Sequence, residues 1–183
     1  MALVLRSGAD VPAMERAGLE TTPDGRRLSA VQLRAHAAAS YELRLSILVD
    51  GDWRPRTVAA RIEGAGEARA LALTGDGAGT WTAGEEPLVA LYGAVDVSAA
   101  WTPLGLTPAI RRLDLSVGET GELVVVEIPF PGRDLARVRY RLHRLDPDHY
   151  ELTTGEGRHV LQVADDGLVT SWPGRWERVL HEA

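Results

Sequence analysis

Alternation of apolar and polar residues constrains this chain more than any other feature. Between positions 41 and 50 every second residue is apolar, and Leu48 is the only exception among the polar positions. Successive side chains of a β-strand point to opposite faces, so this pattern places one apolar column on one face of a strand. The segments 57–63 and 137–143 repeat the pattern. The chain is therefore predicted to consist mainly of half-buried strands.

Turn signals separate these segments. The dipeptide Asp-Gly occurs at positions 24–25, 50–51, 76–77 and 166–167, each time between apolar-periodic segments. Asp-Gly suits the positive φ angles of tight hairpin turns. Four such turns predict an antiparallel meander.

Helix signals are weak by comparison. The alanine-rich segment from Ser29 to Ser40 also alternates with period two, and we interpret it as a strand. The run Val124–Val126 predicts a strand that is buried on both faces or carries a bulge. The segment from Leu91 to Leu115, with its prolines, tryptophan and paired arginines, is too irregular for one ordinary strand. We expect the rest of the sheet to converge on it.

These elements predict a mainly β fold with little helix. We expect residues 1–183 to form a single domain, an antiparallel curved sheet that closes into a barrel or half-barrel, because a flat sheet would expose an apolar face and two edges. The inner face would be lined by Leu43, Leu45, Ile47, Val58, Ile62, Val138 and Leu142. A barrel too wide for side chains to fill encloses a ligand cavity. The exposed column Arg137, Arg139 and Arg141 is interpreted as a solvated outer face.

Composition excludes several functions. The 183 residues contain no cysteine and no lysine, which removes disulfides, thiolate chemistry and Schiff-base chemistry. The formal charge of −6 argues against nucleic-acid binding. The apolar N-terminal stretch is too short for a secretory signal, and no apolar run could span a membrane. We expect a cytoplasmic protein that is not membrane-spanning.

Several motifs resemble a known bacterial family. Residues 50–56 (DGDWRPR), 76–81 (DGAGTW) and 91–96 (LYGAVD) resemble the D-x-x-W-x-x-R, D-G-x-G-x-W and L-x-G-x-x-D motifs of the putative glycolipid-binding proteins. Thr102-Pro103 followed by Ile110-Arg111-Arg112-Leu113, and the segment 165–174, are similar to further motifs of that family. The order and spacing agree from about Leu19 to Arg178.

This resemblance implies a barrel-like β fold similar to bacterial lipoprotein carriers. It also implies a site for a glycolipid or another long-chain amphiphile such as a fatty acid. The chain departs from the family at residues 105–109 (GLTPA), where the family has T-N-T-L-P. An amide that could bind a sugar hydroxyl is lost there, so we expect a ligand that is less polar at that point.

Within the irregular segment, four residues are candidates for ligand binding. We place Arg111 and Arg112 on a strand, where consecutive side chains point to opposite faces and only one could line a pocket. That arginine would bind a phosphate or carboxylate head group, or would pair with Asp96 as part of the structure. Trp101 could stack on a sugar ring or acyl chain, or belong to the core.

Two further ligand-binding candidates lie outside that segment. Arg56 comes from the first family motif, and Tyr140 from the inward column of its strand. Trp53 and Trp81 lie beside turns and are predicted to close the barrel ends.

The sequence favours binding over catalysis. It contains no metal-binding histidine spacing, no nucleophile elbow and no dinucleotide-binding glycine motif, so we expect no metal, no cofactor and no catalytic residue. One alternative is a hydrolase of sugar or lipid conjugates that uses the carboxylates of Glu20 and Asp96. Another is a packed barrel that acts as an interaction module. A homodimer is compatible with an exposed strand edge.

Overall fold

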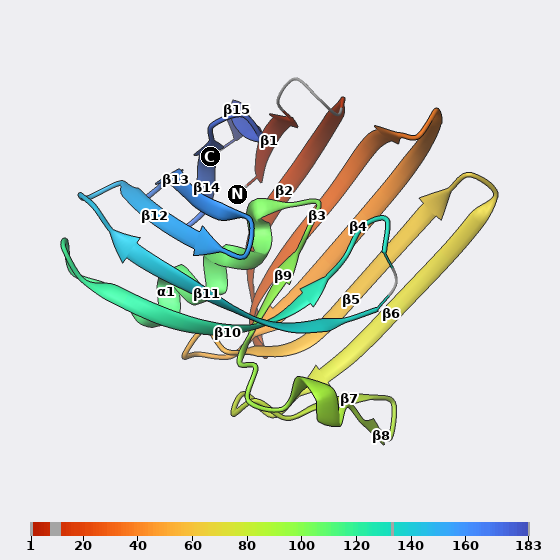
Figure 1. Ribbon diagram of the computed structural model, residues 1–183, viewed down its shortest axis with the longest axis horizontal. Coiled ribbons are helices and arrows are strands. Elements are labelled where there is room, and N and C mark those ends of the chain that lie inside the picture. Colours follow the sequence, from red (N-terminus) through yellow and green to blue (C-terminus); the bar gives the residue numbers. More distant parts are fainter. Residues whose placement is uncertain (1, 8–11, 133, 183) are drawn as a thin grey trace.

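The computed structural model describes residues 2–7, 12–132 and 134–182, and their strands form one 15-stranded sheet (Figure 1). The elements are β1 (Ala2–Ser7), β2 (Ala13–Thr22), β3 (Gly25–His36), β4 (Ala39–Val49), β5 (Pro55–Gly64), β6 (Glu67–Gly75), β7 (Trp81–Ala83), β8 (Glu86–Pro87), the 3₁₀ turn η1 (Val89–Leu91), β9 (Asp96–Ala99), the 3₁₀ turn η2 (Pro103–Gly105), α1 (Leu106–Leu113), β10 (Thr120–Ile128), β11 (Ala136–Arg144), β12 (His149–Thr154), β13 (Gly157–Val163), β14 (Val169–Trp172) and β15 (Trp176–Glu182). The predicted mainly β fold with little helix is confirmed.

The sheet is a meander with two arms. Strands β1 to β8 pair in sequence order on one arm, β15 back to β9 follow on the other, and β1 pairs with β15 where the arms join. Every pairing is antiparallel except that of β9 with β10, which is parallel. Figure 1 shows β2 to β6 as a broad curved layer with β10 to β13 curling across it. The predicted half-barrel is therefore confirmed.

Two apolar clusters stabilise this arrangement. The first lies between the arms and joins Leu28, Leu45 and Ile47 of the first arm to Val126 of β10. The second lies between α1 and strands β10 to β14, and includes Val125. Adjacent valines of β10 thus enter different clusters, which confirms the prediction of a strand buried on both faces.

Residues 29–36 of the segment Ser29–Ser40 lie in β3 as predicted, but Ala37 and Ala38 form the turn to β4, so the segment is not one strand. The apolar column of β3 also does not face inward. Val31 and Leu33 are exposed, while Gln32 on the opposite face is fully buried. Polar side chains of β3 therefore enter the interior, and this inversion positions part of the site described below.

The predicted turns all connect strands, although three of the four are five-residue loops and not two-residue hairpins: residues 50–54, 76–80 and 164–168. Asp50 Oδ1 accepts hydrogen bonds from the backbone N–H groups of Asp52 (3.0 Å) and Arg54 (2.9 Å). Asp76 Oδ1 binds the N–H groups of Ala78 and Thr80 in the same way. In the first of these loops the positive φ angle falls on Trp53 (62°). A carboxylate that caps five-residue loops explains why aspartate recurs there.

The prediction that Arg111 and Arg112 lie on a strand is wrong. Residues 106–113 form α1, which directly follows the 3₁₀ turn η2. The helix ends at Asp114, which adopts the left-handed conformation. Apolar residues at 106, 109, 110 and 113 have helical spacing and pack α1 onto the second arm. The arginines lie in the last turn, where cations interact favourably with the helix dipole.

Candidate functional site

A cavity of about 700 Å³ lies between the two arms of the half-barrel. Its wall combines β3 of the first arm with β9, β10 and β11 of the second, and the hairpins β12–β13 and β14–β15 complete it. The volume falls within the range of small-molecule sites, about 300–1,000 Å³. Segments that are far apart in sequence thus surround one chamber.

Aromatic side chains form part of this wall. They are Phe130, Tyr140, Trp172 and Trp176. The hydroxyl of Tyr140 donates a hydrogen bond to Glu127 Oε2. Burial, supported by this contact with Glu127, raises the pKa of Tyr140 well above its usual value. The phenol therefore stays protonated and remains a donor at any physiological pH.

Charged residues also line the cavity: Arg34, Arg139, Arg175, Glu127 and Glu156. Arg175 pairs with Glu156 through Nη2, and its guanidinium lies 5.0 Å from the centre of the Trp172 ring. Arg34 lies 5.6 Å from the centre of the Phe130 ring. Burial, and to a smaller degree the positive charge of Arg175, lowers the pKa of Arg34. Two guanidinium groups of the wall thus lie close to aromatic rings of the same wall.

The loop after β10 borders the cavity and separates it from a smaller one of about 150 Å³. Phe130 faces the larger cavity and packs edge-on against Tyr41, with ring centres 5.2 Å apart. Leu135 and Ile128 line the smaller cavity. Arg69 of β6 donates to the carbonyl of Pro129 (3.1 Å) and to that of Gly132. The first arm thus holds this loop in place.

A buried polar cluster fixes the irregular segment Leu91–Leu115, called the crossing segment below, to the first arm. Glu15 Oε1 accepts a hydrogen bond from Thr102 Oγ1 (2.7 Å), and Oε2 accepts one from Gln32 Nε2 (2.9 Å). Gln32 Nε2 also donates to the carbonyl of Trp101 (2.6 Å). Burial raises the pKa of Glu15 to about 7. The cluster positions the polypeptide next to β9 without itself lining the cavity.

Of the six residues predicted to bind ligand, Tyr140 lines the cavity. Asp96 and Arg112 form a bidentate pair, with Nη2 2.6 Å from Oδ2 and Nε 3.2 Å from Oδ1. The Asp96 side chain is only 2% exposed. Burial raises the pKa of Asp96, and Arg112 opposes that rise. The pairing that the sequence offered as a structural role is therefore present.

The other three candidates lie outside the cavity wall. Trp101 is 1% exposed and belongs to the first apolar cluster. Arg111 Nη1 donates to the carbonyl of Asp165 (3.0 Å), and its guanidinium lies 5.2 Å from the centre of the Trp53 ring. Arg56 Nη1 lies 3.6 Å from Asp50 Oδ2 at the molecular surface.

The carboxylates of the alternative hydrolase are not brought together in a cavity. Glu20 is exposed on β2, with Oε1 3.7 Å from Arg27 Nη1. Asp96 is buried beside Arg112, and neither carboxylate borders either of the two cavities described above. The geometry needed for paired-carboxylate hydrolysis is therefore missing at these two residues.

Sequence reasoning missed Arg34, Glu127, Glu156, Trp172 and Arg175 as residues of the cavity wall. One signal was present for Arg34: it continues the column Leu28, Ala30 and Gln32 that turns inward on β3. The other residues come from hairpins whose meeting point depends on the curvature of the sheet, which no local pattern specifies.

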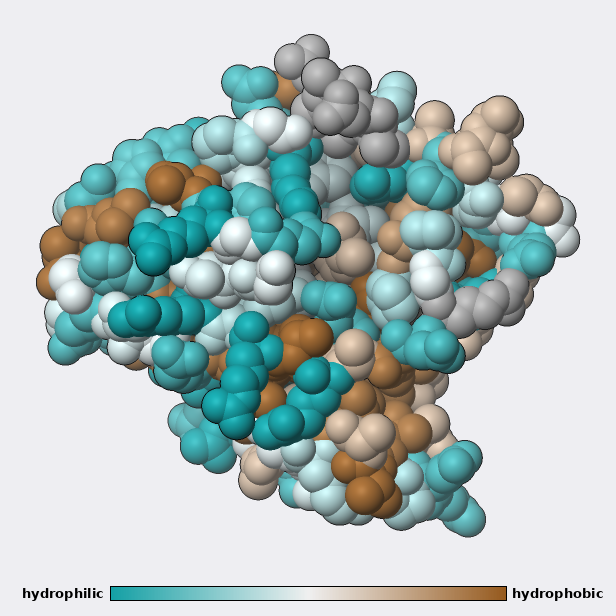
Figure 2. All heavy atoms as spheres, in the orientation of Figure 1, coloured by the Kyte–Doolittle hydropathy of each residue, from teal (hydrophilic) through white to brown (hydrophobic). Residues whose placement is uncertain are grey.

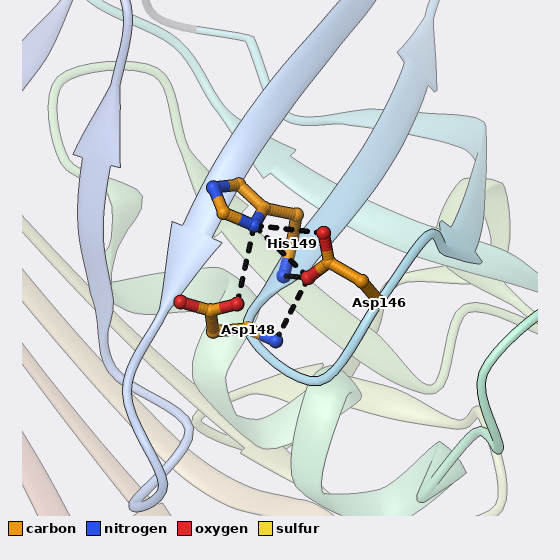
Figure 3. A group of neighbouring side chains, drawn as sticks. All are labelled: Asp146, Asp148 and His149. Carbon is orange, nitrogen blue, oxygen red and sulfur yellow. Dashed lines mark hydrogen bonds and ion pairs between the residues drawn. The ribbon is translucent and has the colours of Figure 1, made fainter.

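Among the described residues, one group could hold a metal ion: Asp146 and Asp148 in the turn before β12, and His149, the first residue of β12 (Figure 3). His149 Nδ1 lies 2.9 Å from Asp146 Oδ1 and 3.2 Å from Asp148 Oδ1. Hydrogen bonding to Asp146 raises the pKa of His149. Asp146 Oδ1 also accepts the N–H groups of Asp148 (3.1 Å) and His149 (2.8 Å). These bonds account for the arrangement as a capped turn.

The molecular surface differs between regions. Figure 2 shows hydrophilic residues interspersed with apolar ones at the β12–β13 side, and apolar residues gathered toward the β7–β8 end of the molecule. Val89 and Tyr92, which follow β8, are 67% and 44% exposed. In the portion of the chain described here, no helix is both long and apolar enough to cross a membrane.

The protein is a mainly β half-barrel whose cavity is lined by aromatic and charged residues. Sequence comparison identifies its family. The profile of the family described as "Putative glycolipid-binding" matches residues 5–178, and the chain belongs to this family. No curated protein matches it. The chain is similar to the crystal structure of a DUF1089 family protein from Pseudomonas aeruginosa, with 29% sequence identity, a TM-score of 0.82 and 95% of each chain covered.

Proposed function

We propose that this protein is a non-enzymatic binding protein whose cavity holds the head group and adjoining chain of a glycolipid or a similar amphiphile. The observation that carries the proposal is the chamber of about 700 Å³. Its wall offers aromatic faces for the ring of a sugar or for an alkyl chain, and polar groups for hydroxyls. The family description names the same class of ligand.

Polar groups of the wall suit a hydroxylated head group. Glu127 and Glu156 are acceptors with lone pairs left over after their bonds to Tyr140 and Arg175. Ser98 and Thr154 also border the cavity. A ring that stacks on Trp172 would meet such groups at its edge, which is how aromatic platforms orient sugars.

Filling the cavity tests the proposal. Val138 lies on β11 beside Tyr140 and is half-buried at the cavity wall. Val138→Trp should occupy part of the chamber and weaken binding of octyl β-D-glucoside at least about tenfold, the loss that a steric clash with a bound ligand produces. Intrinsic tryptophan fluorescence or isothermal titration calorimetry measures the affinity.

The matched control is Val160→Trp, the same substitution at a valine of β13 that is 44% exposed and does not line the cavity. It should bind octyl glucoside like the wild-type protein, and both variants should unfold cooperatively. Equal affinity of the wild-type protein and Val138→Trp, or absence of binding in the wild-type protein, would contradict the proposal.

A further inference from the structure

We propose that the cavity selects an anionic head group, and that Arg34 is the residue that binds its carboxylate, sulfate or phosphate. This inference rests on the proposed function, because it concerns the chemistry of the ligand in the same cavity. It is carried by an imbalance between the charges of the wall and the partners those charges have.

Arg34 is half-buried, and its guanidinium has few protein partners. Its Nε atom is buried and has no hydrogen-bond partner, and Nη1 has only a long contact of 3.5 Å to Gln32 Oε1. Among the described residues, no carboxylate forms an ion pair with Arg34; its other neighbour is the face of Phe130. A buried N–H donor without an acceptor is costly, so this site is incomplete in the protein alone.

Each carboxylate of the wall has a partner other than Arg34. Glu156 pairs with Arg175, and Glu127 accepts a hydrogen bond from the Tyr140 hydroxyl. Arg139 alternates with the inward Val138 and Tyr140 on β11 and is exposed. Arg34 is therefore a cation at the cavity wall without a carboxylate partner.

Arg34 and Arg175 also repel each other across the chamber. The charge of Arg175 contributes to the lowered pKa of Arg34. An anion between the two guanidinium groups would remove this repulsion and supply the acceptor that the Nη atoms of Arg34 lack. Guanidinium groups bind planar oxyanions through two parallel hydrogen bonds, which gives such a site direction as well as affinity.

Two ligands that differ by one group test the inference. Octyl β-D-glucoside and octyl β-D-glucuronide carry the same chain and ring, and only the second carries a carboxylate. The wild-type protein should bind the glucuronide about tenfold or more tightly than the glucoside, the ratio expected of one charge-assisted contact. This preference should fall as salt concentration rises.

Arg34→Gln should abolish the preference, so that the glucuronide binds no more tightly than the glucoside. Arg34→Lys, which keeps the charge but not the planar fork, should retain part of it. Arg27→Gln is the control, because Arg27 lies on the same strand but points to solvent, 49% exposed. Cooperative urea unfolding of Arg34→Gln shows that the variant is folded.

The outcomes are distinct. Equal or weaker binding of the glucuronide by the wild-type protein overturns the inference and leaves the proposed function intact. A preference that survives in Arg34→Gln overturns the assignment to this residue. Failure to bind either glycoside overturns the proposed function and the inference together. Sodium glucuronate and inorganic phosphate form a further arm: if either binds as tightly as octyl glucuronide, the site serves a free anion and not an amphiphile.

Discussion

At the scale of single residues, the buried carboxylates of this protein act as scaffold. Glu15 joins β2 to the crossing segment through Thr102, and Asp96 anchors α1 through Arg112. Glu15 is 0% exposed and Asp96 is 1% exposed, and burial raises the pKa of each carboxyl group. Their hydrogen bonds are thus part of how the half-barrel is held around its cavity.

The raised pKa of Glu15 makes stability depend on pH. Between the ordinary value of 4.5 and about 7, the folded protein keeps this proton while the unfolded chain has lost it, so stability falls as pH rises through this window. The loss should be roughly 3 kcal/mol, and it should level off above pH 7. Glu15→Gln should remove it, as measured by urea unfolding between pH 4.5 and 8.

The control for this prediction is Glu20→Gln, an exposed glutamate on the same strand. Its stability should follow the wild-type pH profile. If the curves of the wild-type protein and Glu15→Gln run parallel between pH 4.5 and 7, the burial of Glu15 does not govern this dependence.

At the scale of elements, α1 is joined to the sheet by one ion pair and an apolar face. Removing Arg112 leaves the Asp96 carboxylate buried without a partner, which should cost about 3 kcal/mol of unfolding free energy in Arg112→Met. Arg111→Met should cost less, because Arg111 is exposed and contacts a ring face and a carbonyl. Urea denaturation measures both.

The double variant Asp96→Asn/Arg112→Met should recover part of the loss, because it removes the uncompensated charge. An Arg112→Met variant that is no less stable than Arg111→Met would show that the pair contributes little to the docking of α1.

Elements differ in how far the sequence predicts them. Strict alternation and capped Asp-Gly turns are local signals, so β3, β4, β5 and their hairpins could be predicted. The helix could not be predicted from the arginine pair alone, although helical spacing of apolar residues from Leu106 to Leu113 was present. The facing of β3 also escaped prediction, because its outward column is more apolar than its inward one.

At the scale of the whole molecule, the cavity depends on the curvature of the sheet. The second arm supplies most of its lining, and Arg34 of β3 borders it from the first arm, so long-range curvature decides which residues share it. Tyr140 was predicted because it lies in an inward column of β11, whereas Glu156 and Arg175 lie in hairpin turns with no such signal. The expected cytoplasmic location, single domain and homodimer stay predictions.

The most direct test of the account is an NMR titration of the tryptophan indole N–H signals with octyl β-D-glucoside, each signal assigned by a Trp→Phe variant. Trp172 and Trp176 border the cavity, whereas Trp53 and Trp81 do not, and the indole of Trp81 donates to the carbonyl of Ala94 (2.6 Å). We predict that the signals of Trp172 and Trp176 shift and saturate at one ligand per protein, while those of Trp53 and Trp81 stay in place. Shifts confined to Trp53 and Trp81, or no saturable shift at any tryptophan, would contradict a ligand bound between the two arms.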